Sequence, residues 1–137
     1  MLVVKSAVGK VMESIIYSLS DGICDDYYLV DIGDFDAACS ILPVDANVRG
    51  VFITHGHHDH IFGINALIAA YPDCIIYASE ECSQMLASAK ANLSMYMEMP
   101  MEYKGEVTIL HDGDIVNLFD GITLNPHCSL MCAKWLF

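Results

Sequence analysis

The 137-residue sequence predicts one α/β (α+β) domain with a mixed β-sheet and flanking helices. Two observations predict this class. Short apolar, β-branched segments come in neighbouring pairs at the start of the chain, and later ones alternate with segments of helical spacing. Hydrophobic residues make up 55% of the chain, which allows a substantial core, and no repeat, low-complexity tract or linker divides it. We therefore expect residues 1–137 to form a single domain.

The first third of the chain predicts strands that pair locally. Strands are expected over residues 1–4, 14–19 and 27–32. The turn signal Asp21-Gly22 predicts that the second and third strands form a hairpin. Asp34 is a suitable N-cap for a short helix, which Pro43 ends.

The rest of the chain predicts alternating strands and helices. An apolar strand over 48–53 precedes a helix over 61–71 that ends at Pro72, and another apolar strand covers 74–78. Ser79 is a suitable N-cap for a helix that runs to about Ala91. Further strands are expected over residues 106–110, 115–118 and 121–124.

Four of the six histidines lie within residues 54–60, on the connection between a predicted strand and a predicted helix. Imidazole nitrogen and carboxylate oxygen are both zinc ligands. His55 and His57 are two residues apart, so an extended loop directs both side chains to one side, while Asp59 and His60 follow in the turn into the helix. The pattern therefore suits two adjacent metals, although a polar loop or a histidine-rich tract that binds metal weakly is the alternative.

The segment Thr54-His55-Gly56-His57-His58-Asp59-His60 resembles the metal-binding signature of the metallo-β-lactamase-fold hydrolases. Leu29-Val30-Asp31-Ile32-Gly33-Asp34 is similar to the early strand of that family, which ends in Asp-x-Gly. Asn92-Leu93-Ser94 and Asp112-Gly113-Asp114 resemble the branch that includes glyoxalase II and related thioesterases. The resemblance covers about residues 1–124, and it implies the first half of an αββα sandwich.

The same resemblance implies a site and a reaction. His55, His57 and His127 would bind a first metal, and Asp59 and His60 a second; Cys128 could compete with His127, because thiolate also binds zinc. Zinc is the expected cofactor, as one or two ions, and other divalent transition metals are possible. Such a metal activates water toward an ester or thioester carbonyl, and Asp59 would orient that water.

Asp31 has two interpretations. It would fix the ring of a metal-binding histidine, as carboxylates often do in zinc sites. Alternatively, it is a strand-end aspartate that caps the neighbouring loop.

The end of the chain departs from the family pattern. The third histidine of the family lies in a Pro-Gly-His segment, whereas this chain has Asn125-Pro126-His127 and no glycine. The aspartate that bridges the two metals and the final histidine of the family have no counterpart after His127. We therefore expect a C-terminally truncated chain with an altered, apolar tail from Leu130.

Charge and cysteine content restrict the partners and the location. A net charge of −12 disfavours nucleic acid and anionic membrane surfaces, and no apolar run reaches the roughly 18 residues of a membrane span. The six cysteines form no C-x-x-C pair, and three lie in apolar contexts, which predicts reduced thiols in the cytoplasm; a disulfide scaffold is the alternative.

Three functions follow from these features. The first is a hydrolase of a small-molecule ester or thioester. The second is a metal-binding relic without turnover, because the bridging carboxylate is missing. The third is an interaction module: a sheet without its second layer would expose an apolar face, so we expect a homo-oligomer that covers this face.

Overall fold

The structure is a computed structural model that describes residues 1–129 and 134–136. The sheet-forming part of the chain contains β1 (Val3–Val8), β2 (Ile15–Ser20), β3 (Asp26–Val30), α1 (Phe35–Ser40), β4 (Asn47–Phe52), α2 (His58–Ile61), α3 (Ile64–Ala70), β5 (Ile75–Ala78), α4 (Glu80–Leu86), the short 3-10 helix η1 (Ser94–Tyr96) and β6 (Thr108–Ile109). The remaining strands are β7 (Val116–Phe119), β8 (Ile122–Leu124), β9 (His127–Ser129) and β10 (Lys134–Leu136).

The main sheet has six strands in the order β1-β2-β3-β4-β5-β6. Its first three strands are antiparallel neighbours, and the strands from β3 to β6 are parallel. Local hairpins come first because short turns join antiparallel strands, whereas each later parallel pair needs a crossover. The predicted mixed sheet and the predicted hairpin are therefore confirmed.

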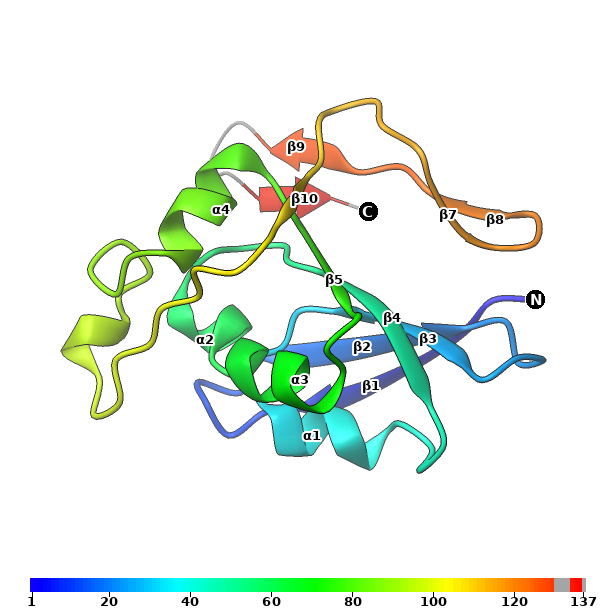
Figure 1. Ribbon diagram of the computed structural model, residues 1–137, viewed down its shortest axis with the longest axis horizontal. Coiled ribbons are helices and arrows are strands. Elements are labelled where there is room, and N and C mark those ends of the chain that lie inside the picture. Colours follow the sequence, from blue (N-terminus) through cyan, green and yellow to red (C-terminus); the bar gives the residue numbers. More distant parts are fainter. Residues whose placement is uncertain (130–133, 137) are drawn as a thin grey trace.

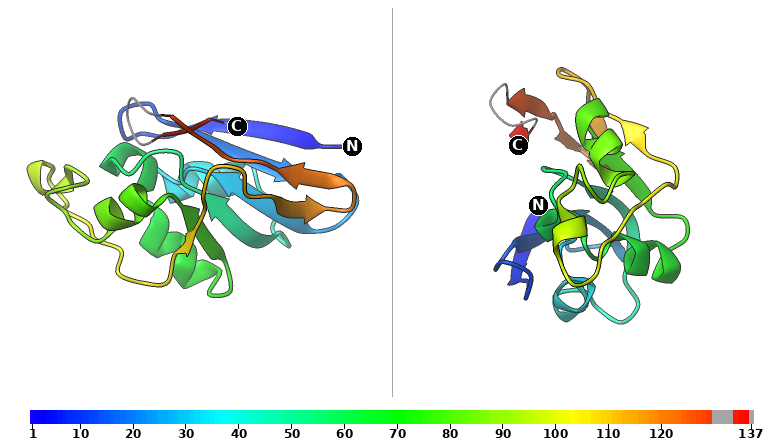
Figure 2. Two further views of the ribbon diagram at one scale, coloured as in Figure 1. Left: turned by 90° about the horizontal axis from the view of Figure 1, so that it is seen from above. Right: turned by 90° about the vertical axis from the view of Figure 1, so that its left-hand side faces the viewer.

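The two faces of this sheet are covered differently. The helices pack on one face, where Leu29, Val51 and Ile76 belong to the larger hydrophobic core. On the other face, Leu19 and Phe52 belong to a smaller core that the β7–β8 hairpin completes with Leu124. Figure 1 and the right-hand view of Figure 2 show α1 and α3 on the opposite side of the sheet from this hairpin.

The second face is incompletely covered near the edge strand β1. Val4 lies opposite Leu19 across the β1–β2 pair, so both side chains are on the face of the smaller core. Val4, Ile15 and Tyr17 nevertheless remain 52%, 44% and 39% exposed. These three residues form an apolar stripe, called the β1–β2 stripe below.

Two helices differ from the predictions. The single helix expected over 61–71 was wrong, because Gly63 separates α2 from α3. The amide of Gly63 donates to the carbonyl of Ile32 at 2.7 Å, and a Cβ on Gly63 would lie 2.8 Å from the nitrogen of Phe35. The next helix, α4, ends at Leu86 instead of about Ala91, at the point where the amide of Tyr103 donates to the Leu86 carbonyl.

Two predictions concern other parts of the chain. Most of the apolar tail from Leu130 lies outside the described residues. Among the described residues, no helix has the length and apolar character needed to cross a membrane.

Candidate metal centre

The histidine-rich loop leaves the sheet at the carboxyl ends of its parallel strands. Beyond β4, the amide of Ile53 donates to the carbonyl of Tyr77 at 2.9 Å, and β3 is tied to the same edge because the amide of Asp31 donates to Phe52 at 2.9 Å. Side chains from successive strand ends therefore converge here, as they do in open α/β sheets generally.

His55 and His57 form the first pair of candidate ligands. Nε2 of His55 contacts Nδ1 of His57, and the two rings are nearly perpendicular, with centroids 3.9 Å apart. Two imidazole nitrogens directed at one point need a shared proton or a cation between their lone pairs. Zinc takes such nitrogens at about 2.0–2.1 Å, so this donor set fits zinc after a small separation of the rings.

Asp59 and His60 form the second pair. Nε2 of His60 lies 3.4 Å from Oδ2 of Asp59, and their side chains are 27% and 19% exposed, respectively. The ring of His60 is also close to the first pair, with its centroid 5.5 Å from that of His55. The loop therefore presents two adjacent donor pairs, each containing at least one imidazole.

Asp31 holds this arrangement from the end of β3. Its carboxylate accepts from the Thr54 amide at 2.7 Å and from the Thr54 hydroxyl at 2.5 Å, and it lies 2.8 Å from Nδ1 of His60. Because an ionised carboxylate only accepts hydrogen bonds, Nδ1 of His60 carries the proton, and Nε2 keeps its lone pair toward Asp59. Both interpretations of Asp31 from the sequence thus correspond to observed contacts.

The backbone of Asp31 and its neighbour Gly33 are unusual. Asp31 has φ of 62°, in the left-handed region that a non-glycine residue seldom adopts. A Cβ on Gly33 would lie 1.9 Å from the carbonyl oxygen of Asp59, so only glycine permits this approach of β3 to the loop. This role of Gly33 was not predicted from the sequence, although the Asp-x-Gly segment contained the signal.

A second contact holds the other side of the loop. The amide of His58 donates to the carbonyl of Asn92 at 2.8 Å, and a Cβ on Gly56 would lie 2.8 Å from Cβ of Met85. The His58 side chain is only 5% exposed, and within the described residues neither ring nitrogen has a hydrogen-bond partner. His58 thus packs inside the protein, and sequence reasoning missed Asn92 as its backbone partner.

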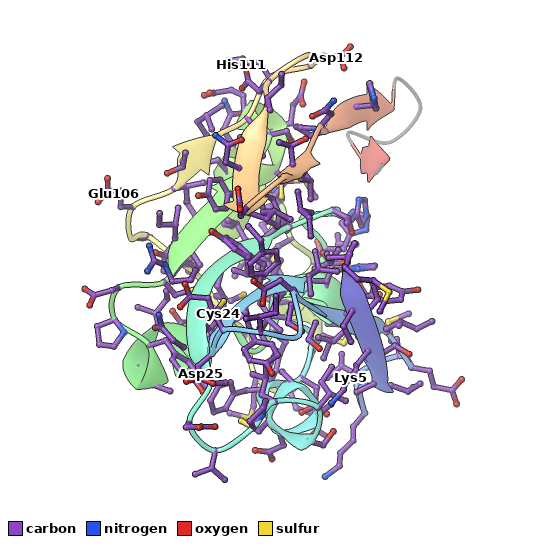
Figure 3. All side chains as sticks on the ribbon, turned by 90° about the vertical axis from the view of Figure 1, so that its right-hand side faces the viewer. Lys5, Cys24, Asp25, Glu106, His111 and Asp112 are labelled. Carbon is purple, nitrogen blue, oxygen red and sulfur yellow. The ribbon has the colours of Figure 1, made fainter. Side chains whose placement is uncertain are left out.

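His127 is placed differently. Its Nδ1 lies 3.4 Å from Oδ1 of Asp112, and both side chains are 67% exposed. Figure 3 shows Asp112 at the opposite end of the molecule from Lys5 of β1. Across residues 1–129 and 134–136, no three His, Cys, Asp or Glu side chains gather closely enough to hold a metal together. The structure therefore does not bring His127 to His55 and His57, its role as third ligand stays a prediction, and the side chain of Cys128 is outside the described part.

A cavity of about 690 Å³ opens beside the two pairs. Asp31, Thr54, His55 and His60 form one polar end, and the rest of the lining is mostly apolar and includes the β1–β2 stripe and residues of β7 and β8. Small-molecule sites typically have this size and this mostly apolar lining.

The thiol of Cys82 is buried and interacts electrostatically with Asp31. Burial and, to a smaller extent, the nearby carboxylate of Asp31 raise the pKa of the Cys82 thiol to about 12, so this side chain is a neutral thiol at pH 7 in the metal-free protein. Cys24, Cys39, Cys74 and Cys82 are all free thiols.

The sheet, the loop and the two donor pairs define a metallo-β-lactamase fold. Residues 45–130 match the Metallo-beta-lactamase superfamily, which is more than half of the chain. The chain therefore belongs to the metallo-beta-lactamase superfamily, as the histidine segment predicts.

Individual relatives refine this assignment. The chain is 42% identical over 78 residues to a hydroxyacylglutathione hydrolase of Glaesserella parasuis, covering 56% of this chain and 31% of that protein. It is 29% identical over 151 aligned positions to a hydroxyacylglutathione hydrolase of Erwinia tasmaniensis, covering 96% of this chain and 51% of that protein. The expected likeness to the glyoxalase II branch is thus confirmed, and the chain spans about half or less of the length of these curated relatives.

A solved structure supports the fold alone. The BLEG-1 B3 metallo-beta-lactamase superimposes with a TM-score of 0.80 at 17% sequence identity, over 97% of this chain and 65% of that one. The expected metallo-β-lactamase-like architecture, mainly its N-terminal half, is confirmed by this likeness.

Proposed function

We propose that this chain, as one domain, carries the metal-binding loop of a zinc-dependent hydrolase of small-molecule thioesters or esters. One observation carries the proposal: Nε2 of His55 and Nδ1 of His57 are directed at the same point. Family membership supports a metallohydrolase, and the donor set suits zinc or another divalent transition metal.

The residues have distinct proposed roles. His55 and His57 hold a first metal, and Asp59 and His60 hold a second. When bound, such a metal polarises a carbonyl and lowers the pKa of water to about 7. Asp59 is the proposed catalytic residue: its carboxylate, 19% exposed, orients the attacking water and accepts its proton.

The proposed substrate is a small acyl compound. The cavity of about 690 Å³ beside His55 and His60 supports an apolar acyl group, because its walls away from the loop are mostly apolar. The likeness to hydroxyacylglutathione hydrolases supports a thioester as the substrate of this chain. The net charge of −12 argues against nucleic acid and anionic membranes as partners and is compatible with the proposed cytoplasmic location.

A second candidate function is metal binding without turnover. The exposed position of His127, paired with Asp112, supports it, because the first metal then has only two imidazole ligands from the described residues. We accordingly expect slow hydrolysis, or none, from this chain alone.

Metal content and thioester hydrolysis of the purified protein separate the two candidates. Turnover at roughly 1–1000 per second that chelation removes would establish the hydrolase. Bound zinc without turnover would establish metal binding alone, and the absence of tightly bound metal would overturn both.

We also propose that the protein self-associates through the β1–β2 stripe, so that the partner copy would also cover the part of the cavity wall that this stripe forms. Val4, Ile15 and Tyr17 are exposed on a sheet face that elsewhere packs against the β7–β8 hairpin. Sedimentation at micromolar concentration tests this: a species at twice the mass is expected, and a single species at the chain mass of 15.1 kDa would contradict it.

A further inference from the structure

Asn92 is the centre of a buried hydrogen-bond network beside the metal loop, called the Asn92 network below. Its side chain is fully buried, at 0% exposure. The amide nitrogen Nδ2 donates to the carbonyls of Met85 and Met101, both at 3.1 Å, and Oδ1 accepts from the amide of Ser94 at 2.9 Å. Since a buried amide costs free energy unless it is paired, these contacts specify asparagine at this position.

Ser94 and Met101 extend the Asn92 network. Oγ of Ser94, also 0% exposed, donates to the Met101 carbonyl at 3.0 Å and accepts from the Met101 amide at 2.9 Å. Leu93, between the two polar residues, has φ of 70°. A non-glycine residue in this left-handed region is held there by its surroundings. The segment from Asn92 to Met101 is therefore fixed by side-chain contacts, with little regular secondary structure.

The Asn92 network contacts the metal loop on both sides of His57. On one side, the His58 amide donates to the Asn92 carbonyl at 2.8 Å. On the other, Gly56 packs against Met85, whose carbonyl accepts from the Asn92 side chain. Asn92 thus closes a ring of contacts through Met85, Gly56, His57 and His58.

We propose that Asn92 is a positioning residue for the metal site, acting by fixing the backbone of His57. The proposal rests on the proposed function of the loop. His57 presents Nδ1, the ring nitrogen nearer to the backbone, so a small backbone displacement moves this donor almost directly. Outer contacts that orient metal ligands commonly contribute 10–100-fold to metal affinity.

The test compares zinc affinity and thermal stability in Asn92→Asp, Ser94→Ala and the control Asn65→Ala. Asn92→Asp keeps the shape and removes both side-chain donors. Asn65→Ala removes an exposed asparagine, whose amide donates to the Glu102 carbonyl at 3.2 Å. We expect zinc affinity to fall about tenfold or more in Asn92→Asp, to fall less in Ser94→Ala, and to be unchanged in Asn65→Ala.

Amide hydrogen exchange of His58 gives a second measurement. It is made on the metal-free protein, so it does not depend on metal binding or on activity. Faster exchange at His58 in Asn92→Asp, at a temperature where the variant is folded, supports the positioning role. If Asn92→Asp does not fold, Ser94→Ala decides the question alone. If the wild type binds zinc and a folded Asn92→Asp or Ser94→Ala variant binds it with unchanged affinity, only this positioning role is overturned. A wild type that binds no zinc would overturn the proposed function and this role together.

Discussion

The two regions that carry candidate ligands differ in the burial and the contacts of those ligands. The loop over residues 54–60 is supported on one side by Asp31 and Gly33 and on the other by Asn92. His127 stands at the opposite extreme: its side chain is 67% exposed, and its ion pair is with Asp112, equally exposed.

This difference shows what a sequence motif needs before its residues form a site. Histidine supplies a ligand atom in both regions, but only the loop is fixed by buried hydrogen bonds that set the directions of its rings. An exposed ligand such as His127, at the start of β9, must lose side-chain entropy when it binds metal. Most of the experiments below change either the loop and its supporting contacts or the exposed His127.

The largest effect is expected from removing the first donor pair. The double variant His55→Ala/His57→Ala should lose tight zinc binding, a fall of more than about a hundredfold, because losing ligands costs more than losing their supporting contacts. Equilibrium dialysis with metal analysis measures it. Unchanged stoichiometry in the double variant would remove the loop from consideration as the metal site.

Asp31→Ala should have the next largest effect on metal binding. It removes the acceptor for Nδ1 of His60 and the acceptor for the partly buried Thr54 amide, so zinc affinity should fall roughly 10–100-fold. Asp31→Asn is the matched control, since it keeps the shape and one acceptor. Equal affinity in the wild type and Asp31→Ala would mean that the loop holds its shape without β3.

Gly33→Ala tests the support by packing alone. Because a Cβ would lie 1.9 Å from the Asp59 carbonyl, the free energy of unfolding should fall by about 1–3 kcal/mol and the Tm by roughly 5–10 °C. Gly113→Ala is the control: a Cβ there meets nothing within 4 Å, and only its φ of 90° is unfavourable. A larger Tm loss in Gly113→Ala than in Gly33→Ala would contradict the steric explanation.

His127→Ala examines the exposed region directly. The exposed side chain should contribute little, so zinc affinity should change by about twofold or less. A fall of tenfold or more would instead mean that His127 moves to the first metal on binding, and would favour the three-histidine site that the family resemblance implies.

The smallest effect concerns pH. The Lys10 amide, 3.0 Å from Oδ2 of Asp34, and then the Ala37 amide hold the pKa of Asp34 below its ordinary value of 3.8. Because the folded-state pKa is lowered, the stabilisation is present above pH 3.8 and is lost as the pH falls through the folded-state pKa. Asp34→Ala should lower the Tm at pH 7 more than at pH 3 in metal-free protein, and an equal loss at both pH values would exclude an ionic contribution.

Much of the fold followed from local patterns. The paired early strands and the alternating later elements predicted the mixed sheet, because hydrophobic periodicity and turn residues act over short distances. The division between α2 and α3 was not predicted, since it depends on the contact of Gly63 with Ile32, more than thirty residues earlier in the chain. Such long-range backbone contacts leave no periodic signal.

The candidate site was predictable to a similar extent. The residue types within 54–60 were sufficient to nominate His55, His57, Asp59 and His60. The supports at Gly33 and Asn92 were visible only as fragments of family-like segments, because their roles are close backbone approaches that composition does not report. His127 was nominated by resemblance alone, and the structure does not place it with the others.

The most direct test of the central claim is X-ray absorption at the zinc edge of the zinc-loaded full chain. The claim that residues 54–60 bind the metal predicts imidazole nitrogens at about 2.0–2.1 Å, with further light-atom ligands from carboxylate or water. The imidazole signal should disappear in His55→Ala/His57→Ala. A dominant sulfur shell at about 2.3 Å in the wild type would contradict the claim and assign the metal to cysteine.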